Sequence, residues 1–169
     1  MALIKRQLQS KIQDLMFQGK AIVLIGARQV GKSTLFQQIL DSEDLPVPRE
    51  QILKLDCDDA EVRTLLEHSD NLNDMRNLVA NNRVIMVDEA QRIQGIGLIL
   101  KLITDHFKEV QLLVTGSSSF VLQGKLNEPL TGRKMEYHLY PISTQELFNT
   151  GGILLVRQTF ESRLIYGSY

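Results

Sequence analysis

The fold is decided by one stretch of the chain, Ala21-Ile22-Val23-Leu24-Ile25-Gly26-Ala27-Arg28-Gln29-Val30-Gly31-Lys32-Ser33. Its beginning, 21–25, is a short continuous apolar run, which is typical of a strand buried on both faces of a parallel sheet. Its end, 26–33, matches the pattern G-x-x-x-x-G-K-[ST] at every position. A helical pattern follows at 32–40, so the stretch predicts a strand, a phosphate-binding loop and a helix in succession.

Each residue type in this loop has a chemical reason. The glycines let the backbone curl so that successive N–H groups point at phosphate oxygens, and the dipole of the following helix favours negative charge. We expect Lys32 to reach the β- and γ-phosphates of a nucleotide and to assist catalysis, and the Ser33 hydroxyl to bind Mg²⁺. The predicted nucleotide-binding residues of the loop are Gly26, Ala27, Arg28, Gln29, Val30, Gly31, Lys32, Ser33 and Thr34. The alternative is a glycine-rich turn without a ligand, and the strand and helix on either side argue against it.

The rest of the chain alternates short apolar runs with helical patterns. Further strands are predicted at 51–55, 83–87, 110–115 and 134–139, and helices at 2–17, 59–67, 71–80, 96–108, 143–148 and 153–165. This order predicts an α/β fold, a three-layer sandwich around a mostly parallel five-stranded sheet with right-handed crossovers. Because ligands lie beyond the carboxyl ends of such strands, we expect the loops that begin at Gly26, Asp88 and Thr115 to meet at one edge.

An apolar run at 84–87 ends in two carboxylates, Asp88 and Glu89. Asp88 is expected to hold Mg²⁺, directly or through water. Glu89, one residue on, is expected to polarise an attacking water as general base. A second acid at this point favours a hydrolase over a small-metabolite kinase, for which an activated water is a hazard. The alternative is that both acids only cap the next helix.

A third polar group follows the strand predicted at 110–115. Thr115, Ser117 and Ser118 bring hydroxyls to the end of this strand. We expect one of them to sense the γ-phosphate or to orient the water, and Ser117 is included among the predicted nucleotide-binding residues. Glycine and serine are also ordinary turn residues, so a turn without function is the alternative.

Transition-state charge in such enzymes is often neutralised by an arginine from the same chain or from a neighbour. Arg133, just before the last predicted strand, is the first candidate for this catalytic role, and Arg28 and Arg92 are weaker ones. A cluster of acids follows the strand predicted at 51–55. It consists of Asp56, Asp58 and Asp59. We expect these acids to be solvated or to cap a helix, with a contact to Mg²⁺ or water as the alternative.

The composition excludes several classes of protein. The chain has 169 residues, of which 43% are hydrophobic, and a net charge of −1, so it is globular and gives no support for nucleic-acid binding. No apolar run is long enough to cross a bilayer, and no membrane partner is expected. One cysteine, Cys57, excludes an intramolecular disulfide, which fits a cytoplasmic location. The histidines lack metal-ligand spacing.

Five segments, in the order in which they occur, carry a resemblance to a known family. They are Gly-Ala-Arg-Gln-Val-Gly-Lys-Ser-Thr at 26–34, Val-Asp-Glu-Ala-Gln-Arg-Ile at 87–93, Thr-Gly-Ser-Ser-Ser-Phe at 115–120, Leu-Thr-Gly-Arg at 130–133 and Tyr-Pro-Ile-Ser at 140–143. Together they resemble the prokaryotic AAA-like ATPases that carry a C-terminal DUF4143 domain. The resemblance runs from about residue 5 to the end. It implies ATP as the nucleotide and an AAA-like P-loop core of the additional-strand, catalytic-glutamate type. It assigns Lys32 and Ser33 to phosphate and magnesium, Asp88 to magnesium and Glu89 to catalysis, and it places a sensor within 115–119.

The same resemblance implies a strand order and a domain plan. The strand that carries the catalytic acid is implied to lie between the P-loop strand and its neighbour. The plan is an N-terminal helix within 1–20 packed on the core, a P-loop ATPase core at 21–150, and at 151–169 the start of a C-terminal helical segment. The remainder of that segment, with a nuclease-like or DNA-associated domain, is expected to be missing from this chain.

The sequence therefore predicts ATP binding and magnesium-dependent ATP hydrolysis, coupled to a conformational change in the missing C-terminal domain. ATP and ADP are the expected small-molecule partners, and a homo-oligomer is a possible source of an arginine in trans. The alternative is a nucleotide-dependent switch or binding module with little turnover. A GTPase is disfavoured because the sequence has no Asn-Lys-x-Asp motif after a late strand.

Overall fold

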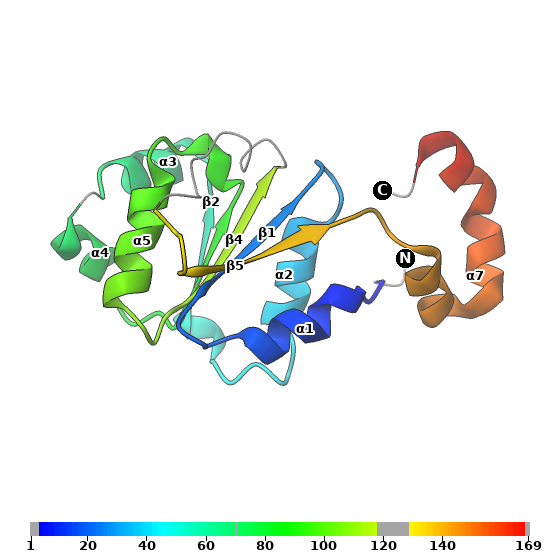
Figure 1. Ribbon diagram of the computed structural model, residues 1–169, viewed down its shortest axis with the longest axis horizontal. Coiled ribbons are helices and arrows are strands. Elements are labelled where there is room, and N and C mark those ends of the chain that lie inside the picture. Colours follow the sequence, from blue (N-terminus) through cyan, green and yellow to red (C-terminus); the bar gives the residue numbers. More distant parts are fainter. Residues whose placement is uncertain (1–3, 70, 118–128, 168–169) are drawn as a thin grey trace.

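The computed structural model describes residues 4–69, 71–117 and 129–167. A five-stranded sheet, in which all paired strands are parallel, forms the middle layer (Figure 1). Its strands are β1 (Ala21–Gly26), β2 (Ile52–Asp56), β3 (Val84–Asp88), β4 (Gln111–Ser117) and β5 (Lys134–Leu139). Their order across the sheet is β2-β3-β4-β1-β5. The predicted α/β class is confirmed, and the sheet is parallel throughout rather than mostly parallel.

The implied place of the acid-bearing strand is wrong. β3 does not lie beside the P-loop strand β1, because β4 lies between them and pairs with both. The inner position suits β4, which is apolar on both faces, with Leu112, Leu113 and Val114 all at most 1% exposed. The additional strand is therefore the one that carries Thr115.

Helices cover both faces of the sheet. On one face lie α1 (Gln7–Leu15) and α2 (Lys32–Leu40), and on the other lie α3 (Ala60–Glu67), α4 (Leu72–Val79) and α5 (Ile96–His106) (Figure 1). Short 3-10 turns at Arg49–Gln51 and Ala90–Arg92 complete the layers. The helix predicted from residue 2 begins only at Gln7, because Arg6 is extended.

Side chains of the strands alternate between two cores, because successive residues of a strand point to opposite faces. In β1, Val23 and Ile25 pack in the core on the side of α5, whereas Ile22 and Leu24 pack in the core on the side of α2. All four side chains are fully buried. This two-sided burial is the property that the continuous apolar run at 21–25 predicted.

The last helix, α7 (Thr144–Tyr166), lies beyond the end of β5 and away from the other strands (Figure 1). Gly151 and Gly152 have non-helical backbone angles and divide it into two helical parts, as the glycine pair predicted. Large apolar side chains are exposed along it: Phe148, Ile153, Leu154, Phe160, Leu164 and Ile165. Within the described ranges, no helix combines the length and the apolar character that crossing a membrane requires.

Candidate functional site

The predicted phosphate-binding loop connects the end of β1 at Gly26 to the start of α2 at Lys32. Gly26 has no room for a side chain, because a Cβ there would collide with the carbonyl oxygen of Leu139 in β5. Gly31 serves a different purpose: its φ of 92° is in the left-handed region that other residues avoid. The loop thus delivers backbone N–H groups to the N-terminus of α2, where the helix dipole favours an anion.

The amino group of Lys32 is buried inside this loop. Its Nζ donates hydrogen bonds to the carbonyl oxygens of Gly26 at 3.2 Å and Ala27 at 2.9 Å. The same nitrogen lies 3.9 Å from Oε1 of Glu89. Lys32 and Glu89 belong to separate motifs that follow β1 and β3, two strands that are not adjacent, and the fold brings them to one point.

Thr115 organises the acidic pair from β4. Its fully buried side chain donates a hydrogen bond to Oδ1 of Asp88, and its Oγ1 accepts the backbone N–H of Glu89 at 2.9 Å. Glu89 has a φ of 51°, which is uncommon for a residue other than glycine and costs conformational energy. The Thr115 hydroxyl therefore helps to hold a strained backbone that aims the Glu89 side chain at the loop.

Gln91 restrains the side chain of Glu89. Its Nε2 donates a hydrogen bond to Oε2 of Glu89, and its Oε1 accepts the backbone N–H of Ser117 at 3.1 Å. Gln91 thus connects the predicted general base to the end of β4. Ser117 is held at this point through its backbone, and Ser118 lies outside the described residues.

Ser33 and Asp88, the predicted magnesium ligands, line one cavity of about 810 Å³ between α2 and the ends of β2 and β3. Asp56 lines it too, and it is in register with Asp88 on the neighbouring strand. Both hydrogen bonds that Asp88 accepts go to its Oδ1. No cluster of three or more His, Cys, Asp or Glu residues suited to a metal occurs in the part of the chain that the structure describes.

The other two acids of the cluster after β2 have separate partners. Asp58 forms an ion pair with Arg92 at 2.9 Å, and Asp59 caps α3 by accepting the N–H of Glu61. Cys57, which stands between Asp56 and Asp58, is buried with no exposed surface. Burial raises the pKa of its thiol to about 12, and the nearby carboxylates, Asp56 first, add to the effect. Cys57 is a packed residue rather than a nucleophile.

The arginine predicted as catalytic is not brought to the loop. The carbonyl oxygen of Arg133 accepts the N–H of Ala21 at 2.9 Å, at the start of β1, whereas the loop follows the end of β1. Its guanidinium forms an ion pair with Asp105 of α5 at 2.5 Å. Arg133 therefore lies at the end of β1 opposite the predicted phosphate-binding loop. Arg28 is exposed on the loop itself.

Two residues of this region escape a search for motifs. Gln91 lies two residues after Glu89, within the segment 87–93. Its position in that segment is the one sequence feature that points to it, and no motif predicts that it contacts Glu89. Arg6 donates a hydrogen bond to the carbonyl oxygen of Val30 in the loop at 3.0 Å. It precedes the loop by about a helix and a strand, so nothing local in the sequence connects the two.

Comparison with known proteins agrees with this architecture. A model of the AAA domain family matches residues 18–148. An uncharacterized protein of Haemophilus influenzae is 26% identical over 135 residues, which are 78% of this chain and 34% of that protein. The chain therefore spans about a third of the length of this relative.

Two solved structures share the fold. The Pif1 helicase from Candida albicans matches with a TM-score of 0.56 at 14% identity, over 86% of this chain and 42% of the helicase. A DNA replication initiation factor matches with a TM-score of 0.55 at 12% identity, over 95% of this chain and 60% of that protein. At these identities the likeness shows the fold alone, which is that of P-loop nucleoside triphosphatases. Because the family match covers the loop, the acidic pair and all five strands, the chain belongs to the AAA domain family.

Proposed function

We propose that this protein binds ATP with Mg²⁺ at 26–33 and hydrolyses it with Glu89 as the general base. The observation that carries the proposal is the approach of Lys32 Nζ to Glu89 Oε1, 3.9 Å apart at the mouth of the loop. A phosphate-binding cation and a candidate base that face the same point suit an attack by water on a terminal phosphate.

Ser33 and Asp88 are the residues that would hold the magnesium ion. A hydroxyl and one carboxylate are a suitable donor set, because Mg²⁺ is usually bound by one or two carboxylates together with phosphates and water. The ion supplies charge neutralisation for the phosphate oxygens. The Oδ2 atom of Asp88 is the available ligand, since its Oδ1 accepts both recorded hydrogen bonds.

The protein's own groups divide the work of hydrolysis. Lys32 and the N–H groups at the start of α2 neutralise charge on the phosphates. Glu89 accepts a proton from the attacking water. Thr115 and Gln91 fix the backbone and side chain of Glu89, so that its carboxylate does not have to be ordered during the reaction.

The test measures ATP binding and steady-state phosphate release for the wild type, Lys32→Ala and Glu89→Gln. We expect Lys32→Ala to lose binding, and Glu89→Gln to bind normally while turnover falls by about a hundredfold or more. Lys20→Ala and Glu109→Gln are matched controls, because both residues are exposed and precede strands at the opposite end of the sheet. Turnover that is insensitive to Glu89→Gln would contradict the proposed role of Glu89.

A second candidate is a nucleotide-dependent switch with little turnover. It is favoured by the position of Arg133, the first candidate for a catalytic arginine, which is paired with Asp105 away from the loop. Tight ATP binding by the wild type, with phosphate release no faster than in Glu89→Gln, would support this candidate. The homo-oligomer, a C-terminal domain of the DUF4143 type and a cytoplasmic location stay predictions.

A further inference from the structure

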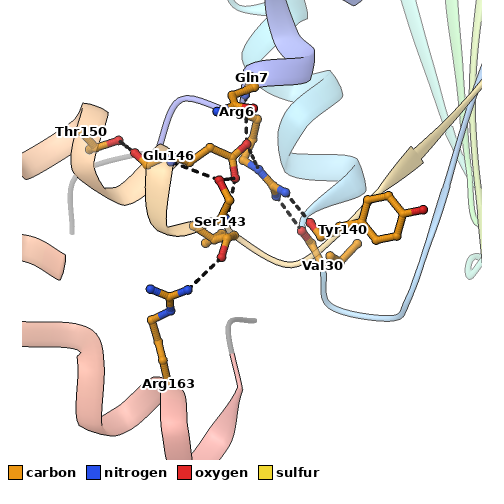
Figure 2. A network of polar contacts seen from close by, with 9 residues as sticks. Arg6, Gln7, Val30, Tyr140, Ser143, Glu146, Thr150 and Arg163 are labelled. Carbon is orange, nitrogen blue, oxygen red and sulfur yellow. Dashed lines mark hydrogen bonds and ion pairs between the residues drawn. The ribbon is translucent and has the colours of Figure 1, made fainter.

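A buried ion pair connects the segment before α1 to the start of α7 (Figure 2). Nε of Arg6 lies 3.0 Å from Oε1 of Glu146, although the two residues are 140 positions apart. Arg6 is 7% exposed and Glu146 is 6% exposed. This pair lies outside the catalytic group of Lys32, Asp88 and Glu89, and the proposed mechanism does not use it.

The guanidinium of Arg6 also reaches the phosphate-binding loop. Its Nη1 donates to the carbonyl oxygen of Val30 at 3.0 Å, and its Nη2 donates to the carbonyl oxygen of Tyr140, which follows β5 (Figure 2). A Cβ added at Gly31 would stand 3.8 Å from the same Nη1. One planar side chain thus holds three segments together: the loop, the connection after β5, and α7.

Glu146 holds the other end of the arrangement. Its Oε1 accepts the backbone N–H of Gln7 at 3.0 Å, and its Oε2 accepts the backbone N–H of Ser143 at 2.8 Å (Figure 2). The Ser143 hydroxyl in turn accepts the N–H of Glu146, which completes a capping box at the start of α7. The carboxylate therefore fixes both Arg6 and the first turn of α7.

Such a pair behaves as a unit. Removing one partner leaves an uncompensated buried charge, which is far more costly than the loss of an exposed ion pair. The planar fork of arginine is also needed here, because the single ammonium group of lysine cannot donate along three fixed directions. A displacement of the Val30 carbonyl therefore changes the position of Arg6, and through Glu146 it changes the start of α7.

We propose that Arg6 is a positioning residue for the phosphate-binding loop, and that the Arg6–Glu146 pair couples the conformation of this loop to the position of α7. The coupling is reciprocal: whatever orders the loop also favours one position of α7, and whatever displaces α7 alters the loop. Its consequence for nucleotide affinity rests on the proposed function, whereas the mechanical connection does not.

The test is amide hydrogen exchange of the whole 169-residue chain without nucleotide, read as the rate in one segment relative to the rate in the core strand β1. We expect Glu146→Gln to raise the relative rate of the loop at 27–33 by about tenfold, and Arg6→Met to raise that of 143–147 by a similar factor. Asp105→Asn is the control, because it removes a carboxylate from another short arginine pair at the opposite end of β1.

Arg6→Lys separates positioning from folding, since it retains a cation next to Glu146. We expect the β1 amides of this variant to exchange as in the wild type, while those of 27–33 exchange faster. Relative rates that stay within about twofold of the wild type in both Glu146→Gln and Arg6→Lys would overturn the proposal.

A second measurement connects the pair to nucleotide. With a fluorescent ATP analogue as the probe, Arg6→Lys is expected to raise the Kd about tenfold and Asp105→Asn to leave it unchanged. An unchanged Kd in Arg6→Lys would remove the link to nucleotide binding. If the wild type binds no nucleotide, the proposed function fails, and hydrogen exchange still decides whether the loop and α7 are coupled.

Discussion

The side-chain hydroxyl of Thr115 donates a hydrogen bond to Oδ1 of Asp88, from the additional strand β4 to the acid-bearing strand β3. The Oγ1 atom of Thr115 also accepts a hydrogen bond from the backbone N–H of Glu89, so that one buried hydroxyl contacts both residues of the acidic pair. This relationship shows that Thr115, a member of the predicted sensor segment, contacts both acids. It also gives the strand order a chemical meaning, because β4 must lie next to β3 for this contact to form.

Replacement of Thr115 by valine tests this contact. The change keeps the shape but removes the shorter of the two hydrogen bonds that the N–H of Glu89 donates, together with the one that Thr115 donates to Asp88. We expect it to lower the free energy of unfolding by about 1–3 kcal/mol. ATP turnover should fall about tenfold or more with little change in nucleotide affinity, because the Glu89 carboxylate is no longer held facing the loop. Thr115→Ser keeps the hydroxyl and should retain most of the turnover. Urea unfolding and steady-state kinetics measure the two effects.

Gln91 is expected to affect kcat rather than affinity. Gln91→Leu removes the hydrogen bonds to Glu89 and to the N–H of Ser117, so the general base becomes free to adopt other rotamers. A loss of about tenfold in kcat at constant nucleotide Kd is the expected outcome. Gln94→Leu, three residues on, serves as the control. Equal kinetics for Gln91→Leu and the wild type would show that the restraint has no role in turnover.

The two glycines of the loop should respond differently to alanine. Gly26→Ala forces a Cβ onto the Leu139 carbonyl, so the backbone of β1 or β5 has to move, and we expect a loss of about 3 kcal/mol or more. In Gly31→Ala the added Cβ has room, with only the Arg6 guanidinium nearby. We expect this variant to lose about 1–2 kcal/mol of unfolding free energy, because its backbone stays in the left-handed region. Thermal or urea unfolding of both variants compares these costs. The reverse order would contradict the packing explanation for Gly26.

Glu146 makes stability depend on pH. Burial alone raises the pKa of this carboxyl, but hydrogen bonds from the Ser143 and Gln7 backbone and from Arg6 outweigh it, and its pKa lies below the ordinary value. A depressed folded-state pKa gives stabilisation that is present above the unfolded-state pKa of about 4.3, and that is lost as the pH falls through the folded-state value.

Glu146→Gln should therefore differ most from the wild type above pH about 5, where it is expected to be less stable by about 3 kcal/mol. This difference should shrink as the solution is acidified below pH about 4. Urea unfolding across this range measures it, with the exposed Glu109→Gln as a control. A difference that stays constant down to the acid limit would show that the Glu146 charge does not contribute.

Cys57 should be unreactive in the folded protein. Its thiol is buried and its pKa is raised to about 12, so almost no thiolate exists at neutral pH. We expect an aromatic disulfide reagent to label Cys57 at the rate of unfolding, and fully once urea has unfolded the chain. Fast labelling without denaturant would contradict the burial of this side chain.

Much of the fold follows from local patterns. The β1 strand, the loop and α2 were predictable because an apolar run, a glycine motif and a helical period lie next to one another at 21–40. The helix break at Gly151 and Gly152 was predictable for the same local reason. Asp88 and Glu89 were assigned as one site with Lys32 because the carboxyl ends of parallel strands meet at one edge.

Other features depend on which strands become neighbours, and no local pattern reports this. The position of β4 between β1 and β3 moves Thr115 next to Asp88, and the start of β5 beside Ala21 carries Arg133 away from the loop. Strand order is a consequence of competing burial over the whole sheet, so it cannot be read from any one segment.

Local sequence patterns predicted the class of the fold, which is confirmed, and they indicate 26–33 as the phosphate-binding loop and Asp88 and Glu89 as the acids. Three contacts could be found only in the folded chain: Gln91 restrains Glu89, Arg133 pairs with Asp105, and Arg6 pairs with Glu146 across 140 positions. The physical reason is that a motif records chemistry required at one place, whereas a buried contact between distant residues depends on the packing of every element between them.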